Sequence, residues 1–164
     1  PRIACEACAP RWCLFLVWFA FVPGALVLVQ DEAAQAPLGL WDAFAVLCAL
    51  TAVALQFFAD EQLRRFRQTE AYRQGATIRL GLWNWSRHPN YFGEVLIWWS
   101  LVPLAIATGV FEYAPVLVLS GPIGMTVFFR FSAWLMDQRS LKRRPEYKET
   151  MHQVSALVPW FPKG

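Results

Sequence analysis

The sequence is poor in charge. Asp, Glu, Lys and Arg make up 16% of its 164 residues, whereas soluble domains carry about 25%. Hydrophobic residues account for 57%, and they include nine tryptophans and thirteen phenylalanines. This composition excludes an ordinary soluble domain and favours a protein that is solvated by lipid.

The sequence also lacks a complete set of metal ligands. Cys5 and Cys8 form a CxxC and Cys13 follows, but no second CxxC and no nearby histidine completes a zinc set. We interpret these cysteines as incidental thiols and expect no metal site. A GxGxxG string is missing as well, so a Rossmann cofactor domain is not indicated.

Long charge-free runs are abundant instead. A helix needs about 20 apolar residues to cross the hydrocarbon core, with about 17 at the short end. Four runs qualify, at 12–29, 43–59, 95–111 and 113–129, and the last reaches residue 136 if Arg130 is tolerated inside it. We therefore predict an all-α fold, a polytopic transmembrane helix bundle of about four spans, as a single transmembrane domain over residues 1–164.

Basic residues are missing from the connections at 30–42 and at residue 112, which carry only acidic charges. They gather in the N-terminal stub, in the 60–92 loop and in the tail after residue 136. Four crossings place these segments on one side, which the positive-inside rule makes the cytoplasm. Because membrane topology accounts for the basic residues and the net charge is only +3, we expect no nucleic-acid partner.

The loop begins with a stretch that carries both charge signs. If the helix of the second span continues into it, Asp60, Arg64 and Arg67 share one face. That face would offer one acceptor and two cations near the membrane surface. An amphipathic exit helix whose arginines meet anionic lipid heads is the alternative, and this stretch alone favours it.

The third apolar run is preceded by the string SRHPNYFGE. Pro89 suits the first position of a helix, and such a helix would bring Asn90 and Glu94 to one face. An ionisable group at this depth usually faces a bundle interior or a wet cavity, although an interfacial Glu94 with a snorkelling Arg87 is possible. Together with His88, these residues lead us to favour a polar site at the cytoplasmic mouth of the bundle.

Arg130 interrupts the last apolar run. It either marks the cytoplasmic end of that span or points inward at an anionic ligand, and both interpretations stay open. Asp137 follows two helical turns later on a similar face. The tail then carries Lys142, Arg143 and Arg144, which suit lipid head groups or, with the basic loop, phosphates.

Three strings occur in order along the chain: ADxxLxxFR at 59–67, SRHPNYFGE at 86–94, and RPEY with a closing proline in the tail. Together they resemble the membrane reductases of the steroid 5-alpha-reductase C-terminal type. The bacterial branch described as a domain of unknown function, DUF1295, is the most similar. The resemblance covers residues 40–162, and the middle string is the specific one.

The resemblance implies a multi-helix membrane fold that binds NADPH from the cytoplasmic side, in a bacterial inner membrane. Its members pass a hydride to a carbon–carbon double bond of a lipophilic substrate, such as an enone, a steroid-like molecule or a lipid. Arginine side chains would hold the phosphates, and a dry pocket between helices would hold the nicotinamide and substrate. With Arg130 added from the pattern above, the expected cofactor-binding residues are Asp60, Arg64, Arg67, Arg87, His88, Asn90, Tyr91, Glu94, Arg130, Asp137 and Tyr147.

The sequence departs from the family pattern in two ways. Thr150 and Val154 stand where the tail of the family has a tyrosine and a threonine. The family also places its substrate-side acid and proton donor in an N-terminal half that this chain is expected to lack. We therefore interpret the chain as the C-terminal part of a larger membrane reductase and assign no catalytic residue and no oligomeric state.

Two other functions remain as alternatives. The isoprenylcysteine carboxyl methyltransferases use S-adenosylmethionine and share an RHPxY-type string, but Asp137 and Gln138 replace the Glu-Glu pair of their tail. A non-catalytic membrane scaffold that binds lipid would explain the spans and basic loops, but not the SRHPNYFGE string.

Overall fold

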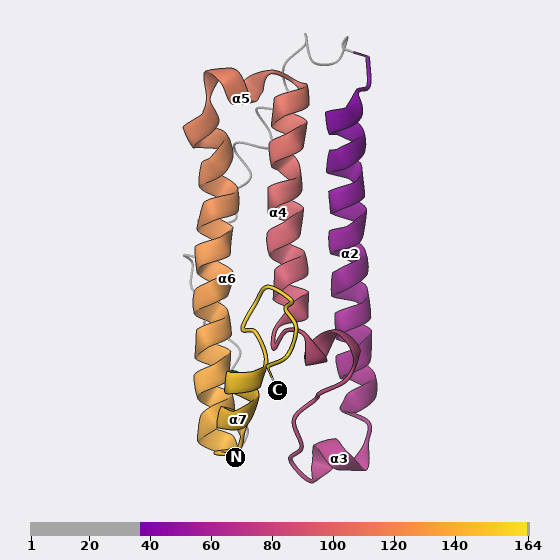
Figure 1. Ribbon diagram of the computed structural model, residues 1–164, viewed down its shortest axis with the longest axis vertical. Coiled ribbons are helices and arrows are strands. Elements are labelled where there is room, and N and C mark those ends of the chain that lie inside the picture. The colour runs from indigo at the N-terminus through magenta and orange to yellow at the C-terminus, as the bar shows by residue number, and fades with distance from the viewer. Residues whose placement is uncertain (1–36, 164) are drawn as a thin grey trace, which may run out of the picture.

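Three long helices lie side by side along the molecule (Figure 1). The computed structural model describes residues 37–163, and no strand occurs within that range. The elements in order are α2 (Leu40–Phe66), α3 (Glu70–Arg73), the 3-10 helix η2 (Gly81–Asn84), α4 (Pro89–Ala107), α5 (Val110–Tyr113), α6 (Pro115–Arg143) and α7 (Tyr147–Gln153). The all-α prediction is confirmed.

Helices α2, α4 and α6 are each long and apolar enough to cross a membrane. They confirm the spans expected at 43–59, 95–111 and 113–129, and the chain is a membrane protein by this criterion. The remaining expected span at 12–29 and the CxxC at 5–8 lie outside the described residues.

The helix boundaries differ from the ends of the apolar runs. Pro89 is the first residue of α4, as predicted, because a proline at this position loses no helical hydrogen bond. Helix α4 stops before Gly109, whose φ of 74° is left-handed and ends the helix inside the apolar run. Helix α6 continues past Arg130 to Arg143, so Arg130 does not end it.

Helix α4 lies between α2 and α6, and it runs antiparallel to both (Figure 1). The loop with α3 and η2, helix α7 and the C-terminal segment therefore gather at one end of the bundle. This agrees with the sequence-based prediction that loop and tail share one side. It brings three polar segments, far apart in the sequence, to the place where the long helices end.

Small residues let α2 and α4 approach closely, as is common between helices in membranes. Ala45, Ala52 and Ala59 repeat every seven residues along the buried face of α2. On α4, a Cβ added to Gly93 would lie 2.5 Å from Gln56 Cγ and 2.9 Å from the carbonyl oxygen of Ala52. Large apolar side chains on α2 and α6 are exposed instead, including Leu47, Leu50, Phe57, Val127 and Phe131, as expected for surfaces that face lipid.

Replacing Gly93 with alanine is expected to destabilise the bundle by about 1–3 kcal/mol, because the new methyl group overlaps the backbone of α2. The free energy of unfolding in mild detergent measures the effect. Gly124→Ala on α6 is the matched control, since a Cβ at Gly124 meets nothing within 4 Å. Equal stability of the two variants would contradict the close contact.

Candidate functional site

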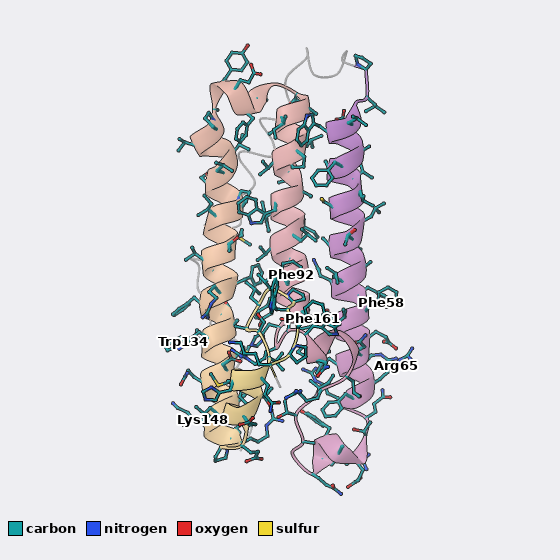
Figure 2. All side chains as sticks on the ribbon, viewed as in Figure 1. Phe58, Arg65, Phe92, Trp134, Lys148 and Phe161 are labelled. Atoms are coloured by element: carbon teal, nitrogen blue, oxygen red, sulfur yellow. The ribbon has the colours of Figure 1, made fainter. Side chains whose placement is uncertain are left out.

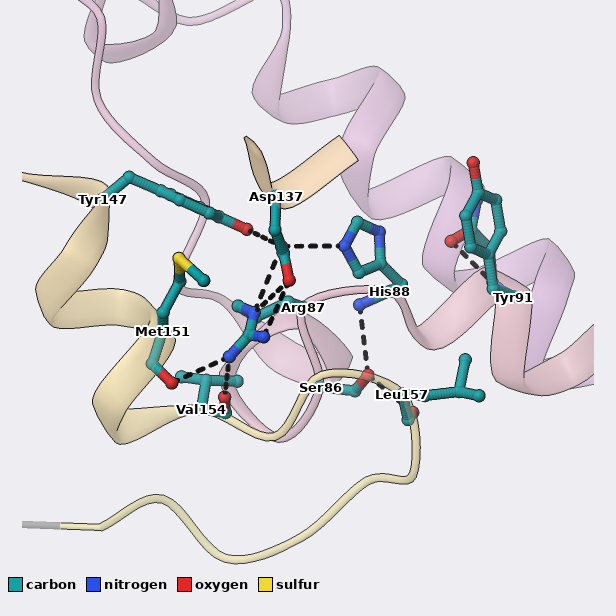
Figure 3. Close-up of polar contacts among 10 residues, drawn as sticks. Ser86, Arg87, His88, Tyr91, Asp137, Tyr147, Met151, Val154 and Leu157 are labelled. Atoms are coloured by element: carbon teal, nitrogen blue, oxygen red, sulfur yellow. Dashed lines mark hydrogen bonds and ion pairs between the residues drawn. The ribbon is translucent and has the colours of Figure 1, made fainter. Parts of the chain in front are cut away.

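A buried carboxylate organises the polar end of the bundle. The side chain of Asp137, near the end of α6, is 2% exposed. It accepts hydrogen bonds from Arg87 Nη2 at 2.8 Å, from His88 Nε2 at 3.0 Å and from the Tyr147 hydroxyl at 2.8 Å (Figure 3). Since the carboxylate is the acceptor in each contact, His88 carries a proton on Nε2. One side chain thus joins α6 to the loop and to α7.

Arg87 is held by the protein on several sides. Its Nε donates to both oxygens of Asp137 at 3.2 Å. Its Nη1 donates to the carbonyl oxygens of Met151 at 2.9 Å and Val154 at 2.5 Å. Its side chain is 8% exposed, so the guanidinium group mainly makes internal hydrogen bonds that join the loop to the tail (Figure 3).

Hydrogen bonds to backbone carbonyl oxygens hold the tail against the same loop. The N–H of Arg87 donates to the carbonyl of Ser155 at 2.8 Å, and the hydroxyl of buried Ser86 donates to the carbonyl of Leu157 at 2.7 Å. The Ser86 oxygen also accepts the N–H of His88 at 3.1 Å, which fixes the entry into α4. Ser86 and Arg87, just before α4, therefore hold the C-terminal segment.

A pocket of about 310 Å³ opens beside this network. The end of α2, the loop, the start of α4, the end of α6 and α7 all contribute to its wall. Ligand pockets typically measure about 300–1,000 Å³, so its volume is at the small end of that range. The lining residues are Leu63, Phe66, Arg67, Tyr72, Thr77, Ile78, Trp83, Arg87, His88, Asn90, Tyr91, Met136, Ser140, Arg143, Arg144, Tyr147 and Thr150.

The pocket wall is rich in arginine. Arg144 donates to the carbonyl oxygens of Gly75 and Ala76 at 3.2 and 2.9 Å, and so anchors the loop. Arg67 and Arg143 also line the pocket, are exposed, and make no ion pair within residues 37–163. These two guanidinium groups are available to an anionic ligand.

Aromatic rings form another part of the wall. The rings of His88 and Tyr91 stack with centroids 5.3 Å apart at an interplanar angle of 14°. The ring of Tyr91 also packs against that of Phe129 on α6, with the ring centroids 5.3 Å apart. Trp83 lies on the loop side and donates from Nε1 to the carbonyl of Ala59 at 2.9 Å. A flat ligand group can stack here while its charges meet the arginines.

Six of the residues expected from the sequence line this pocket, and five do not. The lining residues are Arg67, Arg87, His88, Asn90, Tyr91 and Tyr147, whereas Asp60, Arg64, Glu94, Arg130 and Asp137 are not among them. The cofactor role of all eleven stays a prediction.

Three of the non-lining residues lie on α2 and α4. Asp60 accepts a hydrogen bond from Nδ2 of Asn90, a lining residue, at 3.1 Å and so lies next to the pocket. Glu94 faces Gln56, whose amide, when oriented to match its neighbours, donates to Glu94 Oε1 at 3.3 Å. Arg64 turns outward and pairs with Glu61 at 2.6 Å. Asp60, Arg64 and Arg67, which were expected to act together on one face, therefore have different surroundings: Asp60 bonds to Asn90, Arg64 pairs with Glu61, and Arg67 lines the pocket.

The other two lie on α6. Asp137 is covered by its hydrogen-bond donors, and Arg130 is exposed two helical turns away. Arg143, the last residue of the same helix, lines the pocket; its expected binding to lipid head groups or phosphates stays a prediction.

Several lining residues were not expected from the sequence. Ser140 lies one turn beyond Asp137 on the same helix, and this spacing could have indicated it. Thr77 and Ile78 lie in an irregular loop, where no periodicity exists to place them. Thr150, read as a departure from the family pattern, is a pocket residue and is buried.

Replacing Asp137 with asparagine is expected to lower the free energy of unfolding by about 3–5 kcal/mol, because it leaves the buried Arg87 without a counter-charge. Detergent unfolding monitored by circular dichroism measures this. Asp60→Asn, at an exposed carboxylate, is the control and is expected to change stability by less than about 0.5 kcal/mol. A similar loss in both variants would refute the fastening role of Asp137.

Burial and the adjacent Asp137 carboxylate raise the pKa of Tyr147 above its ordinary value of 10. Above pH 10 the unfolded chain therefore releases this proton while the folded chain keeps it, so stability falls as pH rises. Tyr147→Phe is expected to be less stable than wild type by about 1.5–3 kcal/mol at neutral pH, with a shallower alkaline decline. Unfolding measured from pH 8 to pH 12 tests this; Tyr113→Phe, where the tyrosine is 86% exposed, should keep the wild-type slope. An unchanged slope in Tyr147→Phe would count against the buried phenol.

One comparison with known proteins gives a match. The model of the family described as "Protein of unknown function (DUF1295)" matches residues 5–154, which include the spanning helices α2, α4 and α6 and every lining residue of the pocket. No curated protein and no solved structure matches the chain. Because the family match covers most of its length, the chain belongs to the DUF1295 family of proteins of unknown function.

Proposed function

We propose that this protein functions as a membrane-embedded reductase that uses NADPH to reduce a carbon–carbon double bond in a lipophilic substrate. The observation that carries the proposal is the pocket at the polar end of three membrane-crossing helices, where arginines and stacked aromatic rings face the same space. NADPH would supply the hydride, and the chain would bind and orient it.

The charge of the pocket suits a dinucleotide. NADPH carries several phosphate charges, and arginine binds phosphate through paired, charge-assisted hydrogen bonds. Arg67 and Arg143 have no ion-pair partner within residues 37–163, and they reach the pocket from the ends of two different helices, α2 and α6. A ligand held by both would bridge the outer helices of the bundle.

The polar groups next to the rings suit the sugar and amide portions of the cofactor. Asn90 at the pocket wall offers an amide, and its partner Asp60 offers a carboxylate. Glu94, one turn further into α4, lies beside Gln56. The resemblance of the SRHPNYFGE string to the steroid 5-alpha-reductase type supports the same assignment.

The proposed location is a bacterial inner membrane with loop and tail in the cytoplasm. The basic residues of the loop, α7 and tail gather at one end of the bundle, and the positive-inside rule places such an end in the cytoplasm. The cofactor would then enter from the cytoplasm, and a lipophilic substrate would enter from the lipid.

The pocket chemistry favours NADPH over S-adenosylmethionine. S-adenosylmethionine carries a net positive charge, because its sulfonium and ammonium groups outweigh its carboxylate, and the guanidinium groups of Arg67, Arg143 and Arg144 disfavour a cation. Phosphates gain from the same charges.

Titrating the detergent-solubilised protein with NADPH and, in parallel, with S-adenosylmethionine tests the proposal. NADPH is expected to bind, and Arg143→Gln is expected to weaken binding about tenfold, the equivalent of one lost charged contact of about 1.4 kcal/mol. Arg73→Gln is the matched control, because Arg73 pairs with Glu70 on α3 and does not line the pocket. Binding of S-adenosylmethionine alone would support the methyltransferase alternative, and binding of neither ligand would favour a scaffold.

A further inference from the structure

The C-terminal segment folds back toward the bundle after α7. The base of the segment, where its two ends meet, is held by a β-bridge between Ser86 and Ser155. The N–H of Lys163 also donates to the carbonyl of Gln153 at 2.9 Å. The far part of the segment is held by the N–H of Trp160, which donates to the carbonyl of Trp85 at 3.0 Å. Hydrogen bonds at its base and at Trp160 therefore fix the position of this loop.

The turn carries exposed apolar side chains. Val158, Trp160 and Phe161 are 54%, 67% and 69% exposed, and Trp85, at the end of η2, is 40% exposed. The rings of Trp85 and Phe161 lie 4.9 Å apart. We call these four residues the aromatic tip. The large exposed aromatic surface is costly in water and needs an apolar environment.

Phe161, in the aromatic tip, lies at the level of the membrane-crossing helices (Figure 2). Along the bundle axis, Phe161 lies between Phe92 of α4 and Trp134 of α6, and close to the level of Phe58 of α2 (Figure 2). The charged residues Arg65 and Lys148 lie further toward the polar end (Figure 2). Phe58 and Trp134 are themselves exposed on the outer surface of spanning helices, at 56% and 46%.

We infer that the aromatic tip inserts into the interfacial layer of the bilayer and anchors the C-terminal segment to the lipid surface. Tryptophan favours this layer because its ring is apolar while its indole N–H can bond to head groups or water. Lys163 follows Phe161 by two residues, is exposed, and can extend its ammonium to lipid phosphates. The partner of this surface is therefore lipid, and the inference does not depend on the proposed reductase activity.

The anchor also bears on the site, because the same segment holds Arg87. The carbonyl oxygens of Val154 and Ser155 accept hydrogen bonds from the Arg87 side chain and backbone. Lipid contact at the tip would hold the base of the segment against the loop.

Tryptophan quenching tests the inference on the protein reconstituted into phosphatidylcholine vesicles. Emission is compared between wild type and Trp160→Phe, so that the difference belongs to Trp160. Acyl chains brominated near the head group are expected to quench most of this difference, and aqueous iodide little of it. Phe161→Trp adds an indole to the tip, and its added emission is expected to respond in the same way.

Two reference variants calibrate the measurement. Trp134→Phe reports a tryptophan on the outer surface of α6, and Lys148→Trp places an exposed indole at the polar end. Quenching of the Trp160 signal that follows the α6 reference supports insertion. Quenching by iodide alone would place the tip in water, and protection from both quenchers would place it against protein; either result overturns the inference.

Discussion

The polar end of the bundle depends on the buried ion pair between Asp137 and Arg87. These residues are fifty positions apart, on α6 and on the loop before α4, with Nη2 and Oδ2 2.8 Å apart. Burying two charges is costly unless each finds a partner and further hydrogen bonds. His88, Tyr147 and the tail carbonyls supply those bonds, so loop, α6 and α7 must all be in place together.

This constraint explains why the pocket forms where it does. The ion pair holds the loop against α6, and the pocket lies between this loop, the end of α2, the start of α4, the end of α6 and α7. Arg67 and Arg143 then face this space without ion pairs in the described part of the chain, while Arg87 is occupied by structural bonds. Arginines of one basic region thus divide into those that join parts of the chain and those that face the pocket.

Much of the fold could be predicted from the sequence, but the detailed site only in part. The apolar runs and Pro89 predicted the spanning helices and the start of α4. The left-handed turn at Gly109, which ends α4, could not be predicted, because the residues on both sides of Gly109 are as apolar as the helix. The string SRHPNYFGE indicated where polar residues converge. It could not show that Asp137 joins them, because this contact spans fifty residues.

By itself, the sequence determined the membrane-crossing helices and the concentration of basic residues at one end, because hydrophobic length and charge distribution act along the chain. Tertiary structure alone decided which arginines line the pocket and which form ion pairs with a carboxylate. It also decided that Phe161 returns to the level of the spans. The physical reason is that burial and pairing of a charge depend on what packs against it from distant parts of the chain, and no local pattern encodes those neighbours.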